Sequence, residues 1–327
     1  MHTPSPVGHP EPFDVVVMGE VLVEVATDAA FGHGVPAQLG ISGDALNVAA
    51  SAAAAGARVG LLAVLTDDEL GQAIAARVAE LGISTELLRF RRGQQGVYLV
   101  HSDPHGEREF SYARRGSVGS TLSPEDVQEA VISTAGAVVA SGIACAISPE
   151  TRAAVVKAAR MARRFIYDPN YRPRLTSQAD AAAVLAELAP YATLVTPSYP
   201  GETRALIGAN SPTDAAAKLR ALGAAWVAVT CGADGIQLES DDDGGWIHSV
   251  PAPAVVDQTG AGDSFIGTTA ARLVLGDRLA DAARLGAAAA SLVVGGKGGT
   301  GFIPTLEQTR AHAGVAAERN GGLPSHA

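Results

Sequence analysis

Short apolar runs alternate with helical segments through the second half of the chain, and this alternation limits the possible folds more than any other feature. Four apolar runs predict buried strands at 137–141, 165–168, 194–196 and 226–230. Helical patterns lie between or after them at 149–162, 178–188, 201–207 and 213–222. Repeated strand–helix–strand units form right-handed crossovers, so the pattern predicts an α/β fold with a mostly parallel central sheet and helices on both faces.

The first half of the chain predicts a second, smaller sheet. A strand at 21–26 alternates in polarity, and a hairpin is expected from strands at 96–101 and 107–113, with its turn at 103–106. We expect residues of about 20–42 and 92–119 to form a small β-sheet lid over a site on the main body. The alternative is an antiparallel edge of the main sheet. An uncovered small sheet has edges and an apolar face, so we expect a homodimer or higher homo-oligomer through the lid.

Composition limits the classes of protein and partner. The 327 residues are organised as one domain at 13–315, with flexible termini expected at 1–12 and 317–327. A formal net charge of -10 argues against a nucleic-acid partner. No signal peptide or run of membrane-spanning length is visible, so no membrane partner is expected. Cys145 and Cys231 form neither a disulfide framework nor a zinc pattern, which fits a reducing cytoplasm.

The segment 257–265, with the sequence DQTGAGDSF, joins a glycine-rich turn to a helix start. Gly260 and Gly262 allow a tight turn and leave no side chain above the helix. The free N–H groups at a helix N-terminus attract anions. Asp263 is therefore either a general base beside an anion-binding loop or a simple stabiliser of the helix start, and the residues alone leave both interpretations open.

Other polar residues fall where ligands usually bind. Asp168, Thr196 and Thr230 follow strands, and ligands of parallel sheets bind beyond the carboxyl ends of the strands. The glycine-rich segment 295–301 is either a plain loop or the wall of a nucleotide base pocket. No dinucleotide-binding fingerprint and no P-loop occurs, so a dinucleotide-dependent oxidoreductase is disfavoured.

Two segments resemble the signatures of one family. Residues 257–265 resemble the C-terminal motif of the ribokinase-like (PfkB) sugar kinases, and SGDALNVAASAAAAG at 42–56 resembles their N-terminal motif, with Ser42 in place of its first glycine. The resemblance extends from about residue 14 to about residue 310. It implies a ribokinase-like fold and transfer of phosphate from ATP to a hydroxyl of a small sugar or sugar acid.

The resemblance assigns roles around the helix start. Asp263 would be the general base for the attacking hydroxyl, and the amides of Gly260, Ala261 and Gly262 would form the anion hole for the transferring phosphoryl group. Phosphoryl transfer depends mainly on positioning and charge neutralisation, which such a loop supplies. The positions that match nucleotide contacts of the family are Asn170, Thr230, Gly232, Gly235, Gly260 and Gly262.

The resemblance also implies cations. Glu202 matches the glutamate of an Asn-x-x-Glu motif that positions Mg²⁺ through water, although PSYPGE at 197–202 has no asparagine and is one residue longer. Asp257 and Thr259 match positions that hold a monovalent cation such as K⁺ in some members. Their alternative role is to bond within a turn. ATP and Mg²⁺ are the expected cofactors, with K⁺ as a further candidate.

Three segments bear on the substrate, and the first, Gly43–Asp44, lies at the position of the family's sugar-contacting loop. FSYARRGS at 110–117 and DPNYRPR at 168–174 resemble segments of the 2-keto-3-deoxygluconate kinases. Arg114 and Arg172 each present a planar fork that matches a carboxylate, which favours a sugar acid. The other expected substrate contacts are Gly43, Asp44, Asn47, Tyr98, Tyr112 and Asp263. Fructokinases share part of the second segment, so a neutral-sugar kinase is the alternative, and a catalytically silent sugar- or nucleotide-binding protein is the non-kinase alternative.

Overall fold

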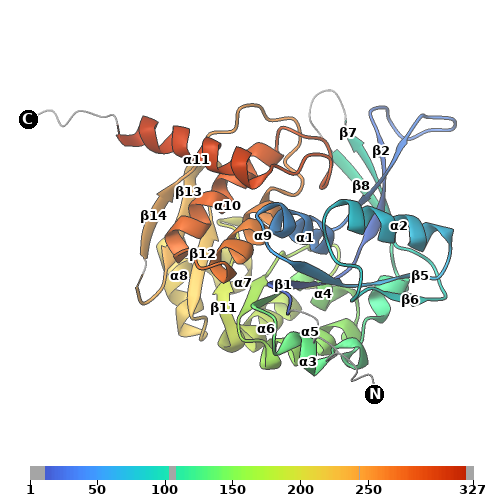
Figure 1. The fold of residues 1–327 in the computed structure, drawn as a ribbon, viewed down its shortest axis with the longest axis horizontal. Coiled ribbons are helices and arrows are strands. Elements are labelled where there is room, and N and C mark those ends of the chain that lie inside the picture. The colour runs from blue at the N-terminus through green and yellow to red at the C-terminus, as the bar shows by residue number, and fades with distance from the viewer. Residues whose placement is uncertain (1–11, 103–107, 243, 322–327) are drawn as a thin grey trace, which may run out of the picture.

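An eight-stranded sheet forms the centre of the molecule, as a computed structural model that describes residues 12–102, 108–242 and 244–321 shows (Figure 1). Seven neighbouring pairs join the strands, and the pairs from β4 to β12 are all parallel. The strands in spatial order are β14 (Gly244–His248), β13 (Gly235–Glu239), β12 (Trp226–Thr230), β11 (Ala192–Val195), β10 (Phe165–Asp168), β9 (Ala137–Ser141), β1 (Val15–Met18) and β4 (Val59–Leu62). The predicted α/β fold with a mostly parallel sheet is confirmed.

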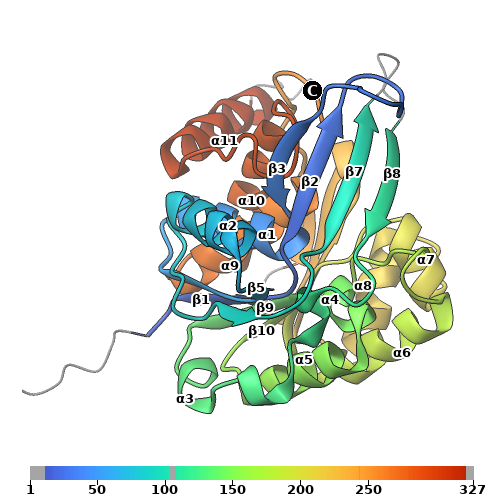
Figure 2. The same cartoon turned by 90° about the vertical axis from the view of Figure 1, so that its right-hand side faces the viewer.

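Helices cover both faces of this sheet (Figure 2). One face carries α1 (Asp44–Ala54), α2 (Glu69–Glu80), α9 (Ala261–Val274) and α10 (Leu279–Val293). The other carries α3 (Glu129–Ile132), α4 (Gly142–Ile147), α5 (Pro149–Met161), α6 (Gln178–Leu188), α7 (Gly201–Ile207) and α8 (Pro212–Ala221). Val15 and Val17 of β1 point to the first group, whereas Val16 and Met18 point to the second. A central parallel strand is apolar on both sides because both faces are buried.

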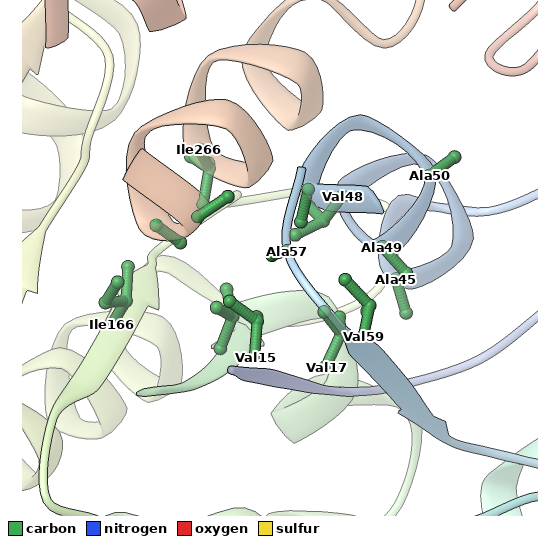
Figure 3. Packing of buried hydrophobic residues seen from close by; sticks show 14 of the residues in the cluster. Val15, Val17, Ala45, Val48, Ala49, Ala50, Ala57, Val59, Ile166 and Ile266 are labelled. Carbon is green, nitrogen blue, oxygen red and sulfur yellow. The ribbon is translucent and has the colours of Figure 1, made fainter. Parts of the chain in front are cut away.

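The close packing of α1 on α9 brings distant parts of the chain together. In Figure 3, Val48 and Ala49 of α1 and Ile266 of α9 lie over Val15 and Val17 of the sheet. A Cβ atom on Gly267 would lie 2.2 Å from the carbonyl oxygen of Val48, so only glycine permits this approach. The small side chains of α1 serve the same purpose. As a result, the N-terminal ends of both helices open onto one cavity.

The predicted lid is a separate four-stranded sheet that projects from the body (Figure 2). Its strands in spatial order are β3 (Gln38–Ser42), β2 (Leu22–Thr27), β7 (Val97–Ser102) and β8 (Arg108–Ala113). Strand β2 pairs in parallel with β7, and the other pairs are antiparallel. The turn expected at 103–106 lies outside the described residues. Strands 96–113 are absent from the central sheet as described, so the edge-strand alternative is wrong.

Several local elements differ from what their own residues predict. Residues 58–64 have a strand-like pattern, but the strand is broken at Ala63 into β4 and β5 (Val64–Thr66), and β5 pairs with β6 (Arg89–Arg91) in a third sheet. Ser123 followed by Pro124 is typical of a helix start, but only one 3-10 turn, η2 (Pro124–Asp126), follows, held by a capping box. Helix α11 (Leu306–Gly321) covers part of the tail expected to be loosely ordered. In the parts of the chain that the structure describes, no helix is long and apolar enough to span a bilayer.

Candidate active site

A cavity of about 1090 Å³ lies between the lid and the carboxyl ends of the central strands. Its lining brings together the site residues predicted from four separated segments. These are Gly43, Asp44 and Asn47 at α1, Tyr98, Tyr112 and Arg114 at the lid, Asn170, Arg172, Glu202 and Thr230 beyond the strands, and Gly260, Gly262 and Asp263 at α9. Such a crevice is where parallel sheets bind ligands.

Asp263 lies at the start of α9 and is held by Asn47 of α1. The Asn47 Nδ2 atom donates a hydrogen bond of 2.8 Å to Oδ2 of Asp263, although the two residues are 216 positions apart. The pKa of Asp263 is raised to about 7, mainly by burial and then by the charge of Asp44, while the Asn47 hydrogen bond and Arg172 oppose the shift. A carboxyl group that titrates near neutral pH is suited to accept a proton.

The backbone before Asp263 forms the turn expected from the sequence. Gly260 has φ 81° and begins α9, and no side chain caps this helix end. A Cβ atom on Gly260 would lie 3.1 Å from the carbonyl oxygen of Gly299, so the loop also packs against a second glycine-rich segment. Gly262 has no neighbour within 4 Å of its Cβ position and lies open on the cavity wall. The uncapped N-terminus of a 14-residue helix therefore faces the cavity beside Asp263.

The start of α1 forms the neighbouring wall. Gly43 has φ 129°, and a Cβ atom there would lie 2.7 Å from the carbonyl oxygen of Glu20, so the chain requires glycine at this crossing between lid and body. Asp44 accepts a hydrogen bond from the hydroxyl of Ser141 at the end of β9. Asp44 is thereby fixed close enough to Asp263 for their charges to interact.

Asp168 and Glu202 add two more carboxylates, and Asp168 was not among the predicted site residues. Oδ1 of Asp168 accepts the amide of Asn170 at 3.1 Å and supports its positive φ of 38°. Glu202 accepts the amides of Tyr171 at 2.5 Å and Ser198 at 2.7 Å, which joins the loops after β10 and β11. Burial raises the pKa of Asp168 well above its usual range, and the charges of Glu202 and Asp263 add to the effect. Its position at a strand end was the sequence signal for it.

The carboxylates fit a hard divalent cation held mostly by other ligands. In the described ranges, no three histidine, cysteine, aspartate or glutamate side chains lie together as a direct metal site. Oxygen donors such as Glu202 and Asp168 suit Mg²⁺, which keeps several waters and binds phosphate oxygens. The cavity gathers negative charge from Asp44, Asp168, Glu202 and Asp263, which a cation would neutralise. Such a metal would supply charge neutralisation for bound phosphates.

The two predicted arginines differ in their surroundings. Arg114 lines the cavity, but its Nη2 atom lies 2.5 Å from Oε2 of Glu20, and both side chains are buried. The geometry is that of an ion pair rather than a hydrogen bond, and Nε of Arg114 has no acceptor within the described chain. Ser117 donates a hydrogen bond of 2.6 Å to Glu20. Arg172 is exposed in the cavity, and its Nη1 atom donates a weak hydrogen bond of 3.5 Å to the carbonyl oxygen of Tyr171. Sequence reasoning did not identify Glu20, which lies between two apolar strands.

The lid contributes an aromatic wall. The hydroxyl of Tyr98 donates to Glu24, and burial followed by the charge of Glu24 raises the pKa of Tyr98. The ring centroids of Tyr98 and Tyr112 are 5.9 Å apart, and Tyr112 is 46% exposed. Arg174 of the body donates a hydrogen bond of 2.9 Å to the carbonyl oxygen of Phe110 in β8. This contact joins the loop that carries Arg172 to the lid.

The predicted nucleotide and cation residues are spread more widely. Thr230 lines the cavity, whereas Gly232 and Gly235 lie outside its lining. A Cβ atom on Gly235 would lie 2.2 Å from the carbonyl oxygen of Ile247, which gives this glycine a role in pairing β13 with β14. Asp257 accepts the amides of Thr259 at 2.6 Å and Gly298 at 2.9 Å. The two carboxylate oxygens of Asp257 thus join the turn before α9 to the glycine-rich segment.

The family follows from a comparison with known proteins. The model of the pfkB family of carbohydrate kinases matches residues 13–306. The chain belongs to this family. This pfkB protein is 33% identical to the 2-dehydro-3-deoxygluconokinase of Thermoproteus tenax over 243 residues, which are 73% of this chain and 74% of that protein. It is 29% identical to the probable fructokinase-4 of Arabidopsis thaliana over 261 residues, which are 76% of this chain and 79% of that protein.

Solved structures share the fold of this pfkB protein. The TM-score is 0.82 with the 2-dehydro-3-deoxygluconokinase of Thermotoga maritima, at 21% identity and with 92% of this chain and 99% of that chain covered. The TM-score is 0.83 with a putative ribokinase II of E. coli in complex with ATP and Mg²⁺, at 22% identity and with 92% of this chain and 99% of that chain covered. These likenesses confirm the ribokinase-like fold, and the family match makes the protein a carbohydrate kinase.

Proposed function

We propose that this pfkB protein transfers the γ-phosphate of ATP to a hydroxyl of a sugar acid, with Asp263 as the general base. The observation that carries the proposal is the Asp263 carboxylate, held by Asn47 at 2.8 Å beside the uncapped start of α9. The sugar hydroxyl oxygen attacks the γ-phosphorus while the bond to the bridging β,γ-oxygen breaks, and ADP leaves. The hydroxyl proton goes to Asp263, whose pKa of about 7 allows it to be ionised near neutral pH.

The chain's own groups also supply the other requirements of phosphoryl transfer. The backbone amides at Gly260, Ala261 and Gly262 stabilise charge on the transferring group. Asn170 and Thr230 lie on the cavity wall where the phosphates would lie, and Glu202 orients Mg²⁺ through water. Asp257 and Thr259 form the candidate K⁺ site beside this turn. The glycine-rich segment 295–301 borders an adjoining cavity of about 780 Å³, together with Thr259.

The proposed substrate is 2-keto-3-deoxygluconate. Arg172 is exposed in the cavity and faces an excess of carboxylates, and a bound carboxylate would give its fork a partner. Arg114 has an unsatisfied Nε donor on the opposite wall. The relatives named 2-dehydro-3-deoxygluconokinase in Thermoproteus tenax and Bacillus subtilis support this choice. Fructose is the second candidate, because Glu20 neutralises the charge of Arg114 and relatives named fructokinase also match.

The experiment is a comparison of ATP consumption with 2-keto-3-deoxygluconate, its galactose-derived epimer, fructose and ribose as acceptors. We expect the highest kcat/KM for a keto-deoxy sugar acid, since a desolvated carboxylate–arginine contact contributes about 1.5–3 kcal/mol. A preference for fructose or ribose would contradict the sugar-acid assignment and leave the kinase assignment intact.

We further propose that the outer face of the lid pairs with a second copy of this chain. Leu39 of β3 is 71% exposed and lies in register with Val25, which pairs with Leu99 of β7. These apolar side chains form a row across the sheet that is exposed at Leu39 and half-buried at Val25 and Leu99, and an apolar row that reaches the edge of a sheet favours association. Light scattering should give the mass of a dimer for the natural protein and a lower mass for Leu39→Asp. A monomeric natural protein would refute this pairing.

A further inference from the structure

The glycine-rich segment 295–301 contacts both the turn before α9 and the lid. It meets the anion-binding turn through Asp257 and the lid through the hydroxyl of Thr300, which donates a hydrogen bond of 2.8 Å to the carbonyl oxygen of Ile41. Between these two anchors lies Gly299, which is buried. The two roles expected for this segment, a wall of a nucleotide base pocket and a plain loop, do not explain why a glycine is buried at position 299.

Gly299 is constrained by space rather than by backbone conformation. Its φ is not in the left-handed region, unlike that of Gly298 at 71°. A Cβ atom on Gly299 would lie 2.5 Å from Nδ2 and 2.6 Å from Oδ1 of Asn47, and 2.6 Å from Oγ of Ser42. Such separations are well inside van der Waals contact, so an added methyl group would displace a neighbour. Asn47 is the neighbour that holds Asp263.

The segment cannot easily retreat to make room. The Gly298 amide is fixed to Asp257 at 2.9 Å, and the Thr300 carbonyl accepts a hydrogen bond of 3.3 Å from Arg77. The hydroxyl of Thr300 adds its bond to the lid. Both flanks are therefore pinned, and the displacement would fall on the carboxamide of Asn47. Turning that group would lengthen or break its 2.8 Å bond to Asp263.

We propose that Gly299 is a positioning residue for catalysis, which acts by holding the Asn47 carboxamide against the Asp263 carboxylate. The proposal rests on the proposed role of Asp263 as base. It makes the glycine-rich segment a physical link between the lid, the anion-binding turn and the base. A side chain at 299 reduces turnover without contacting substrate or nucleotide.

The test is a double-mutant cycle of Gly299→Ala and Asn47→Ala, with kcat measured against pH. Gly299→Ala alone should lower kcat about fivefold near pH 7 and move the acid limb of the pH profile about one pH unit higher, since a hydrogen bond to an ionised group is lost. KM for ATP should stay within about twofold of the natural value. In the Asn47→Ala background, Gly299→Ala should have a much smaller effect, because the methyl group enters the space left by the carboxamide and only the close contact with Oγ of Ser42 remains. The proposal would be overturned if the fold losses in kcat of the two substitutions simply multiply in the double variant. It would also be overturned if the acid limb of the pH profile does not shift in Gly299→Ala.

Two further measurements keep the result interpretable. Gly314→Ala is the matched control, since no atom lies within 4 Å of that Cβ position on α11, and it should leave kcat unchanged. If Gly299→Ala fails to fold, the double variant should fold, because two of the three close contacts of the added methyl group are with Asn47; failure of both would overturn the proposal. The same cycle on the free energy of unfolding detects the coupling without turnover. If unfolding shows coupling while Asp263→Asn retains activity, the proposed base is wrong and the Gly299–Asn47 contact stands.

Discussion

Removal of the Asn47 carboxamide should change the pH dependence of turnover more than its maximum. Asn47 donates one hydrogen bond of 2.8 Å to a carboxylate whose pKa is about 7. A hydrogen bond to a charged group contributes about 1.5–3 kcal/mol, or about 1–2 pKa units. Asp263 is only half-buried, so water partly replaces the lost donor. The lower end of this range, about one pKa unit, therefore applies. In Asn47→Ala the pKa of Asp263 should therefore rise to about 8.

The size of the effect follows from the ionised fraction of Asp263. Near pH 7 this fraction falls from about one half to about one tenth, so kcat should fall about fivefold, and it should recover above about pH 9.5. The assay is steady-state kcat from about pH 6 to about pH 10 with saturating ATP and sugar. Ser51→Ala is the matched control, because Ser51 is buried one turn further along α1 and lies outside the cavity lining. An equal loss of kcat at every pH would refute the reasoning.

Two other substitutions give separate tests. Arg172→Lys should lower kcat/KM for the sugar acid about tenfold and that for fructose much less, because an ammonium cannot reproduce the planar fork; equal losses for both sugars would contradict a carboxylate contact. Asp263→Asn should be more stable than the natural protein near pH 8. The folded pKa of about 7 exceeds the unfolded value of 3.8, so the stability that Asp263 contributes is present below about pH 4 and is lost as pH rises through 7. Urea unfolding should show a gain of about 2–4 kcal/mol near pH 8 and almost none near pH 4.

Much of the fold could be predicted because it depends on local patterns. Continuous apolar runs predicted the parallel strands, and alternating apolar and polar residues predicted the lid hairpin. Both patterns depend only on residues that are neighbours in the sequence. The break between β4 and β5 and the edge hairpin of β13 and β14 were not predicted. The first depends on pairing with Arg89–Arg91, and the second on pairing along the edge of the finished sheet, so neither has a local signal.

The site could be predicted in its membership but not in its contacts. Asn47 was expected to bind substrate, and the structure shows it bonded to Asp263 across the α1–α9 packing that Gly267 permits. Arg114 was expected to bind a substrate carboxylate together with Arg172, and the structure adds an ion pair between Arg114 and Glu20 that was not expected. Both contacts join residues about 100 or more positions apart, so they depend on the packed fold rather than on spacing in the sequence.

The most direct test of the account is the turnover of Asp263→Asn with the best sugar acceptor. The carboxamide keeps the shape of the side chain and can still bond to Asn47, but it cannot take the hydroxyl proton. The account predicts that kcat falls at least about 100-fold, a typical contribution of a general base, while the circular dichroism spectrum and ATP affinity are retained. Turnover close to that of the natural protein would contradict the central claim that Asp263 is the base of a sugar kinase.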